Sequence, residues 1–297
     1  MSFQNVVLTV IGGVGYGVFS EEGARLQTIR TLYGSVSYST LQIRDSSEIV
    51  FISRHQGERH VPPHKINYRA LVKAAQKIGA PVLAVNSVGM MRSIPLSENF
   101  GKRKEMCVTL ETFLEHPFFV PNDFIDFTKN RAGTFYNNDT VHADMTDPYC
   151  ADMRGLLKGV LSDKKISYSE GVYLCAEGPR FETKAEIRMF SQFADVVGMT
   201  GVPEVVLAKE AGLCYASLCV ITNPAAGLSR NMVTADEVKT IAEKTQRSVF
   251  EIISKLADSL AARVAEDSVR GISKPPTNSK KPAERCKCKK ATAGGKL

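Results

Sequence analysis

The sequence has no apolar run of 18 residues, the length that a membrane-spanning helix needs, so we expect no transmembrane segment. Its first residues, MSFQNVVLTVIGG, lack the basic start and the small-residue cleavage site of a secretory signal peptide. Their apolar stretch leads directly into glycines, which is typical of a first β-strand. We therefore expect a protein of the cytoplasm.

The sequence also has little net charge outside one segment. From position 268 to the end it holds nine Lys and Arg and one Glu, a net charge of +8, which leaves −1 for the other 267 residues of a chain whose total is +7. No basic face interleaved with aromatic residues is visible in this near-neutral body. The composition therefore argues against nucleic-acid binding.

The seven cysteines do not form a recognisable metal-binding or disulfide framework. Their number is odd and no secretion signal precedes them, which favours a reducing compartment. Cys286 and Cys288 lie close together, but no second pair completes a zinc site. Most of the others lie in apolar, strand-like surroundings, where a thiol packs as a small hydrophobic group.

The remaining pattern is an alternation of strands and helices. Strands are predicted at 6–11, 48–52, 82–88, 196–199 and 215–222, each rich in β-branched residues and bounded by turn signals. A helix is predicted at 203–211, opened by Pro203 and ended by Gly212. A longer one is predicted at about 235–265, with one apolar face formed by Val249, Ile253, Leu256, Leu260 and Val264. This order indicates an α/β fold with a mostly parallel or mixed sheet, covered on both sides.

We expect one domain over residues 1–266, with a long polar excursion at 92–117. Residues 267–297 are low in apolar content and rich in Lys, Pro and Gly, a composition typical of a disordered tail. The final Gly-Lys-Leu resembles a peroxisomal address, although glycine is a poor match for its first position.

The first motif is the glycine loop Gly12-Gly13-Val14-Gly15 after the first strand. Glycines allow backbone N–H groups to approach an anion closely, so the loop is either an anion site or a tight structural turn. A dinucleotide-binding loop is the rival interpretation, because GGVGYG resembles GxGxxG. Val14 and Val18 stand where that pattern needs glycine, and no acidic residue is well placed about 20 positions later.

The second motif, Ser53-Arg54-His55-Gln56-Gly57, closes the strand at 48–52. Arg presents a planar fork that suits phosphate oxygens, and His can donate one more hydrogen bond. Two further histidines, His60 and His64, follow in the sequence. They suggest metal ligands or a surface loop, but no HExxH arrangement or nearby Cys or carboxylate at ligand spacing supports a metal site.

Four more motifs place polar residues where strands end. They are Asn86-Ser87-Val88-Gly89, the stretch EGPRFET at 177–183, the stretch GMTGVPE at 198–204, and TNPAAG at 222–227. The carboxyl ends of strands in an open α/β sheet border the crevice where ligands bind. Together these motifs predict one shared site.

These segments, in this order, resemble the trimeric nucleoside phosphorylases, a family that includes 5′-methylthioadenosine phosphorylases and 6-oxopurine-specific enzymes. The resemblance covers roughly residues 5–265 and also includes SRHQGERHVPPHKINYRA, FIDFTKNRAGTFY and GMTGVPEVVLAKEAGLCYASL. It implies a single α/β domain with a twisted, partly barrel-like mixed sheet flanked by helices. It also implies a homotrimer with active sites at subunit interfaces, with phosphate as co-substrate and no metal or organic cofactor.

The resemblance assigns a role to each matching position. The phosphate site would comprise Gly13, Val14, Arg54, His55, Asn86, Ser87 and Thr200. The base would be bound by Phe181, Glu182 and Asn223. The ribose and its 5′ group would lie against Met199, His142, Ala235 and Val238, with His142 supplied by a neighbouring subunit. Catalysis would depend on Asn223, His55 and Arg54.

Three positions depart from the family pattern. Val14 stands where the family often has Thr or Ser, which removes one hydroxyl contact to phosphate. Met90 and Met91 follow Gly89 where the family has a second glycine. Activity is still expected, but Val14 keeps open the alternative of a catalytically inactive nucleoside-binding protein.

The chemistry of phosphorolysis agrees with these assignments. Positive charge develops on the ribose and negative charge on the departing purine, so phosphate must be held against C1′ and the base stabilised as it leaves. Asn223 would hydrogen-bond the purine near N7, where electron density accumulates. Attack from the opposite face without a protein nucleophile predicts inversion and a sugar 1-phosphate.

Glu182 and Ala235 bear on the choice of substrate. A carboxylate at Glu182 can accept the N1–H of a 6-oxopurine but would face the bare N1 of adenine. With Asn223, where methylthioadenosine enzymes usually have Asp, this favours a 6-oxopurine over the alternative of a 6-aminopurine. Ala235 stands where hydroxyl-preferring members have His, which favours an apolar 5′ group such as methylthio.

Overall fold

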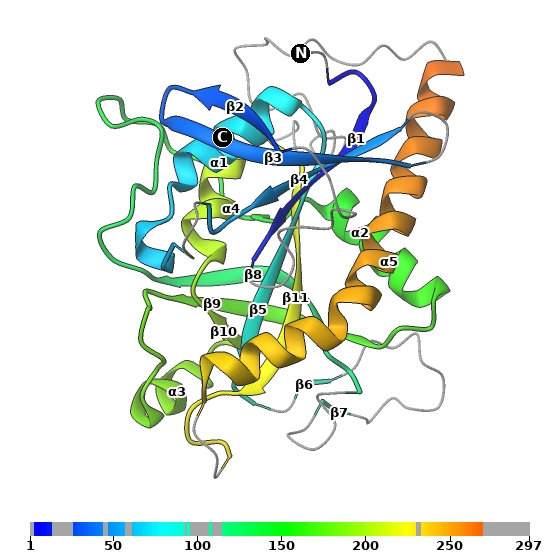
Figure 1. Cartoon of the computed structure of the whole chain (residues 1–297). Helices are drawn as coiled ribbons and strands as arrows, with labels where there is room; N and C mark the ends of the chain where they lie inside the picture. The colour runs from blue at the N-terminus through cyan, green and yellow to red at the C-terminus, as the bar shows by residue number, and fades with distance from the viewer. Residues whose placement is uncertain are drawn as a thin grey trace, which may run out of the picture.

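The computed structural model describes residues 3–13, 26–43, 47–56, 61–92, 94–95, 107–108, 115–229 and 233–269. Within them, nine strands form one mixed sheet in the order β10-β9-β8-β11-β5-β1-β4-β3-β2 (Figure 1). The strands are β1 (Val6–Gly12), β2 (Gln27–Thr31), β3 (Gly34–Gln42), β4 (Glu48–Ser53), β5 (Val82–Met90), β8 (Phe118–Phe127), β9 (Tyr168–Ala176), β10 (Val196–Gly198) and β11 (Tyr215–Pro224). The short strands β6 (Ile94–Pro95) and β7 (Cys107–Val108) pair separately.

The centre of the sheet is parallel. Strands β4, β1, β5 and β11 run in the same direction, so their carboxyl ends meet at one edge. Strand β8 runs antiparallel to β11, and β10 pairs with both β9 and β5, which partly closes five strands into a barrel. The predicted fold, a twisted mixed sheet of partly barrel-like form in an α/β domain, is confirmed.

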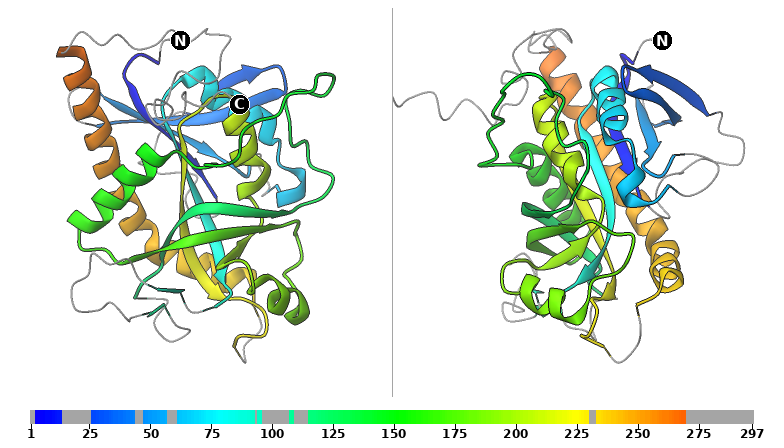
Figure 2. Two further views of the ribbon diagram at one scale, coloured as in Figure 1. Left: turned by 180° about the vertical axis from the view of Figure 1, so that it is seen from behind. Right: turned by 90° about the vertical axis from the view of Figure 1, so that its left-hand side faces the viewer.

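Helices cover both faces of the sheet (Figure 2). On one face lie α1 (Tyr68–Ile78) and α4 (Gly201–Glu210), whose apolar side chains share one core with the sheet. On the other lie α2 (Ala151–Asp163) and α5 (Ala235–Val269), which share a second core. Helix α3 (Lys184–Phe190) packs at the end of the barrel, and a 3₁₀ turn spans Pro63–Lys65. Among the described residues, no helix is long and apolar enough to cross a membrane.

All five strands predicted from sequence are confirmed, and most extend one or two residues further. Strands β2, β3, β8 and β9 were not predicted. The exposed hairpin of β2 and β3 is rich in Ser and Thr, and β8 is interrupted by Pro121-Asn122-Asp123, so neither has a clean apolar pattern.

Helix α5 is longer than predicted and passes the expected domain boundary at residue 266. Of the residues predicted on one apolar face, four are buried, and Val264 near the end of the helix is 37% exposed. Val14, His60, residues 270–297 and most of the 92–117 excursion lie outside the described residues.

Candidate active site

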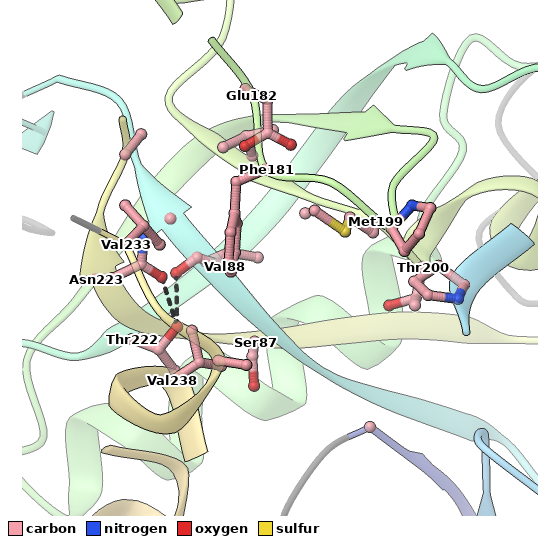
Figure 3. Close-up of a pocket in the computed structure, with 18 of the residues that line it drawn as sticks. Ser87, Val88, Phe181, Glu182, Met199, Thr200, Thr222, Asn223, Val233 and Val238 are labelled. Carbon is pink, nitrogen blue, oxygen red and sulfur yellow. Dashed lines mark hydrogen bonds between the residues drawn. The ribbon is translucent and has the colours of Figure 1, made fainter. Parts of the chain in front are cut away.

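A cavity of about 600 Å³ opens at the carboxyl ends of the parallel strands (Figure 3). Ten of the predicted site residues line it: Gly13, His55, Ser87, Phe181, Glu182, Met199, Thr200, Asn223, Ala235 and Val238. They come from five strand ends, the loop before α3 and the first turn of α5. The prediction that these separate motifs share one crevice is therefore confirmed by the fold.

Arg54 lies behind the cavity wall and not on it. Its side chain is fully buried, and its Nε and Nη2 atoms donate to the two carboxylate oxygens of Glu204 at 2.7 and 3.0 Å. Nη2 also donates to the carbonyl of Ile11, and Nη1 donates to that of Val85. The expectation that the guanidinium fork faces phosphate is wrong, because the fork holds Glu204. A contact to phosphate through the second N–H of Nη1 stays a prediction.

This ion pair is the most deeply buried charged group of the site. Burial by itself disfavours the charge of Arg54, but the carboxylate of Glu204 outweighs that effect and raises the pKa of the guanidinium. The hydroxyl of Tyr215 donates to Glu204 as well, at 2.9 Å. Glu204 belongs to the motif GMTGVPE, but sequence reasoning assigned it no role.

Asn86 also lies behind the wall, where it fixes Thr200. The hydroxyl of Thr200 donates to Asn86 Oδ1 at 3.0 Å, and Asn86 Nδ2 donates to the hydroxyl of Ser217 at 2.7 Å. The backbone N–H groups of Thr200 and Gly201 donate to the hydroxyl of Tyr173. Thr200 can therefore offer a ligand only the acceptor lone pairs of its hydroxyl, because its O–H and its N–H are both donated within the protein.

The backbone N–H of Gly13 and the hydroxyl of Ser87 also lie at this end of the cavity, and only the N–H has a hydrogen-bond partner. The N–H of Gly13 donates to the carbonyl of Val85 at 3.1 Å, so it belongs to the sheet and not to an anion cradle. The Ser87 hydroxyl oxygen is buried, lines the cavity and has no hydrogen-bond partner. An unpaired buried hydroxyl is unfavourable, so its position in a cavity points to a ligand.

His55 has a defined tautomer when it is neutral. Its Nδ1 lies 2.7 Å from the carbonyl oxygen of Val61, and a carbonyl oxygen can only accept, so Nδ1 carries the hydrogen. The neutral ring therefore presents Nε2 as an acceptor. The expectation that His55 donates to phosphate holds only for its protonated form, whereas the neutral ring would accept the proton of a phosphate hydroxyl.

Phe181 and Glu182 form the opposite end of the cavity, on the loop before α3 (Figure 3). A capping box fixes this loop: the Thr183 hydroxyl accepts from the N–H of Glu186, and the Glu186 carboxylate accepts from the N–H of Thr183. Arg180 pairs with Glu186 from outside. The orientation of Phe181 and Glu182 thus follows from a local sequence signature.

Glu182 has an oxygen, Oε1, that is buried and has no hydrogen-bond partner. Burial raises the pKa of this carboxyl above its usual range, and the nearby Glu186 adds to the shift. Its own backbone N–H and Arg180 act against that shift. The side chain is therefore well placed to exchange a hydrogen bond with a ligand in the cavity.

Asn223 lies at an irregularity of the sheet. The pairing of β11 with β5 skips Thr222, and such a bulge changes the direction in which the following side chain points. Asn223 Oδ1 accepts from the Thr222 hydroxyl, and Nδ2 donates to the Pro224 carbonyl, which leaves Nδ2 one further hydrogen. Gly89 makes room for it, since a Cβ there would lie 3.2 Å from Nδ2.

The first turn of α5 forms a third part of the wall. Ala235 and Val238 line it as expected, and so do Asp236 and Lys239, which sequence reasoning did not consider. His142 is exposed and does not line the cavity of its own chain. Its expected contact with a neighbouring subunit's nucleoside stays a prediction.

Within the described residues, no three His, Cys, Asp or Glu side chains are grouped so that they could hold a metal ion. The polar side chains that line the cavity carry hydroxyls, an imidazole, a carboxamide, two carboxyls and the ammonium group of Lys239. These groups suit hydrogen bonding to an oxyanion and to a heterocycle.

The sequence matches the Phosphorylase superfamily over residues 108–258. A relative from Methanosarcina acetivorans, named "Probable S-methyl-5′-thioinosine phosphorylase", is 47% identical over 248 residues, which cover 83% of this chain and 88% of the relative. The 6-oxopurine nucleoside phosphorylase of Pyrococcus furiosus is 35% identical over 263 residues, covering 83% and 90%.

Solved structures of phosphorylases also match this chain. The methylthioadenosine phosphorylase of Schistosoma mansoni in complex with adenine covers 90% of this chain and 95% of its own, with a TM-score of 0.71 and 27% sequence identity. The apo form of the same enzyme also matches, with a TM-score of 0.67 and 26% identity. Sequence and structure therefore point to the same family.

Proposed function

This chain belongs to the phosphorylase superfamily, and we propose that it is a pentosyltransferase that cleaves purine nucleosides with inorganic phosphate. A phosphate oxygen forms a bond to C1′ while the bond from C1′ to the purine nitrogen breaks. The products are the free purine base and a ribose 1-phosphate, or its 5′-methylthio form. Attack from the face opposite the base inverts the configuration at C1′.

One observation carries this proposal: two buried side-chain oxygens without partners, Ser87 Oγ and Glu182 Oε1, border the same cavity. In Figure 3 they lie on opposite sides of Phe181. Each needs a hydrogen-bonding group from a ligand, because a buried polar atom without one is unfavourable by about 1–3 kcal/mol. Phosphate near Ser87 and a purine near Glu182 would satisfy both.

The phosphate end would work through hydroxyls and His55. Ser87 donates to a phosphate oxygen, the Thr200 hydroxyl accepts from a phosphate hydroxyl, and neutral His55 accepts a phosphate proton at Nε2. Arg54, whose charge is balanced by Glu204, would contribute its second Nη1 hydrogen as a donor from behind the wall. The bound phosphate then stabilises the cationic ribose of the transition state electrostatically.

The base end would stabilise the leaving purine. The remaining hydrogen of Asn223 Nδ2 donates to N7, where negative charge develops as the bond to C1′ breaks. Phe181 stacks on the purine ring, and Glu182 accepts the N1–H of a 6-oxopurine. Donors aimed at developing charge contribute about 3–4 kcal/mol each in other enzymes.

We infer a preference for 6-oxopurines and for an apolar 5′ group. Relatives named for S-methyl-5′-thioinosine and for 6-oxopurine nucleosides support the first inference. Ala235, Val233 and Val238 on the cavity wall support the second. A 6-aminopurine preference is the alternative, since the similar solved structures are methylthioadenosine phosphorylases.

We further propose a cytoplasmic homotrimer that uses phosphate as co-substrate without a metal or organic cofactor. His142 supports the trimer, because it is exposed, far in sequence from the cavity residues, and carried on the long loop after β8. It would complete the 5′ end of a neighbouring subunit's cavity.

The test is a panel of inosine, guanosine, adenosine and their 5′-methylthio forms, with release of free base measured with and without added phosphate. We expect phosphate-dependent release, fastest for a 6-oxopurine carrying a 5′-methylthio group. Binding of nucleosides without release of base would identify the inactive binding protein instead. Faster cleavage of the adenosine forms would overturn the base preference but leave the phosphorylase assignment intact.

A further inference from the structure

Arg131 is a buried side chain that contacts several segments around the cavity, although it does not line the cavity itself. Its side chain is 2% exposed. Nη1 donates to the carbonyl oxygens of Met199 at 2.8 Å and Val202 at 2.7 Å. Nη2 donates to the carbonyl oxygen of Glu177 at 2.6 Å, and Nε donates to its carboxylate at 3.0 Å.

These partners belong to two different walls. Met199 and Val202 lie between β10 and α4, and Met199 is the residue expected under the ribose. Glu177 follows β9 and begins the loop that carries Phe181 and Glu182. One planar guanidinium therefore bridges the ribose wall and the base wall.

The two walls also touch directly. A Cβ at Gly178 would lie 2.6 Å from the sulfur of Met199, so the thioether packs against the backbone of the base loop. Gly178 has a φ of +65°, a conformation that suits glycine. Any change in the separation of the walls therefore moves Met199 relative to Phe181 and Glu182.

The phosphate end has separate supports. The side chain of Arg54 is held by Glu204, and Thr200 is held by Asn86 and Tyr173. Arg131 reaches Thr200 only through the backbone carbonyls of Met199 and Val202 on either side of it. A disturbance at Arg131 should therefore affect nucleoside binding more than phosphate binding, because Thr200 keeps its contacts with Asn86 and Tyr173.

We propose that Arg131 is a positioning residue for the nucleoside, which fixes the width of the cavity between Met199 and the loop of Phe181 and Glu182. This inference rests on the phosphorolysis proposed above. Tyr68 holds the guanidinium from a third side, since its hydroxyl lies 3.2 Å from Nη1 and its ring lies under the guanidinium carbon at 5.5 Å.

The test is Arg131→Lys, which keeps the charge but offers one nitrogen that cannot reach both walls. We expect the KM for nucleoside to rise about tenfold while the KM for phosphate stays within about twofold of wild type. The dissociation constant of the nucleoside, measured by calorimetry without phosphate, should rise in parallel. An equal rise in both KM values, or a lower kcat with both unchanged, would show a merely structural role and overturn the proposal.

Two further variants keep the test decisive if Arg131→Lys does not fold. Glu177→Gln removes only the ion pair, and it should raise the nucleoside KM about threefold without changing the phosphate KM. An unchanged nucleoside KM in this variant would overturn the proposal. The matched control is Arg154→Lys, which alters a comparable ion pair with Glu170 away from the cavity and should change neither KM.

The wild type separates this inference from the proposed function. A wild type that neither binds nor cleaves purine nucleosides overturns both. An active wild type whose Arg131 and Glu177 variants fail the predicted split between the two KM values overturns the role of Arg131 alone.

Discussion

The two ends of the cavity are built in different ways. The phosphate end rests on the carboxyl ends of parallel strands, and its supports are fully buried: the ion pair of Arg54 with Glu204, and the chain from Thr200 through Asn86 to Ser217. The base end rests on a loop between β9 and α3, where Phe181 is 37% exposed and Arg180 pairs with Glu186 at the surface.

This difference predicts a fixed geometry at the phosphate end and an adaptable one at the base end. Buried networks have discrete geometries, because a half-satisfied one is strongly unfavourable, so the phosphate end offers one arrangement of donors. Surface caps and loops are held by interactions of about 1 kcal/mol each and open locally. The phosphate end therefore suits the reactant that every phosphorolysis shares, and the base end suits the one that varies.

The largest expected effect is at Glu204. Glu204→Gln leaves the buried charge of Arg54 without its counter-ion, which should lower the free energy of unfolding by about 3–5 kcal/mol. Thr183→Ala at the base end removes one helix cap and should lower it by about 1 kcal/mol. Thermal unfolding at one protein concentration compares the two variants. Equal losses would contradict the comparison.

The ion pair of Arg54 with Glu204 also determines which substitutions can test the role of Arg54. Arg54→Ala would leave the Glu204 carboxylate buried and unpaired, so a loss of phosphate binding in that variant would include a loss of structure. The double variant Arg54→Met with Glu204→Leu removes both charges and should recover most of the stability lost in Glu204→Gln. Its phosphate KM then reports the contribution of the whole ion pair without a large loss of structure.

The next effect is a pH dependence of base choice through Glu182. Burial raises the pKa of this carboxyl, so it becomes protonated on acidification before an ordinary Glu does. The ionised form accepts the N1–H of a 6-oxopurine, and the protonated form donates to the bare N1 of a 6-aminopurine. As pH falls, the ratio of kcat/KM for methylthioinosine to that for methylthioadenosine should fall. The change corresponds to about 1–3 kcal/mol in the difference between the two activation free energies.

Glu182→Gln is the matched control for this pH effect, because its amide does not titrate. It should flatten the pH dependence of the ratio. Glu186 and Arg180 are unchanged in this variant, so any contribution that they make to the pH dependence remains visible. A ratio that changes equally with pH in wild type and variant would assign the effect to another group.

A smaller effect is expected at Gly89, where the two ends meet. A Cβ at this position would lie 3.2 Å from Asn223 Nδ2, so Gly89→Ala should displace the amide that donates to the leaving base. We expect kcat to fall about tenfold with the phosphate KM nearly unchanged. Gly159→Ala in α2 is the control, since nothing lies within 4 Å of its Cβ and it should only stabilise the helix, by about 0.5–1 kcal/mol.

The sequence alone predicts the parallel centre of the sheet, because its strands are apolar and end at motifs with Gly, Asn or Thr. It also brings together the residues that line the cavity, since polar strand ends of one α/β sheet share an edge. It does not predict the hairpin of β2 and β3, because these strands are rich in Thr and Ser and lack an apolar pattern, although they pair in the sheet.

The sequence also does not predict in which direction a side chain of the site points or which groups it contacts. Arg54 and Glu204 are 150 positions apart, so nothing local shows that the guanidinium fork points away from the cavity. Arg131 lies in the recognised motif FIDFTKNRAGTFY, but its partners come from three distant segments. Residue type identifies a candidate, and only the fold shows which groups it contacts.

The smallest expected effect is at Glu186, on the outside of the base end. Hydrogen bonds from Arg180 and from the N–H of Thr183 lower the pKa of this carboxyl from 4.5 to about 2. Such a group stabilises the folded state above its ordinary pKa, and its contribution disappears as pH falls from about 4.5 toward 2. Because the pair is exposed, Glu186→Gln should destabilise α3 by only about 0.5–1 kcal/mol near neutral pH. Hydrogen exchange of the α3 amides measures this local opening, with α2 as the internal reference. The difference between variant and wild type should vanish near pH 2. A loss that extends to the strands of the phosphate end would mean that the two ends are not independently supported.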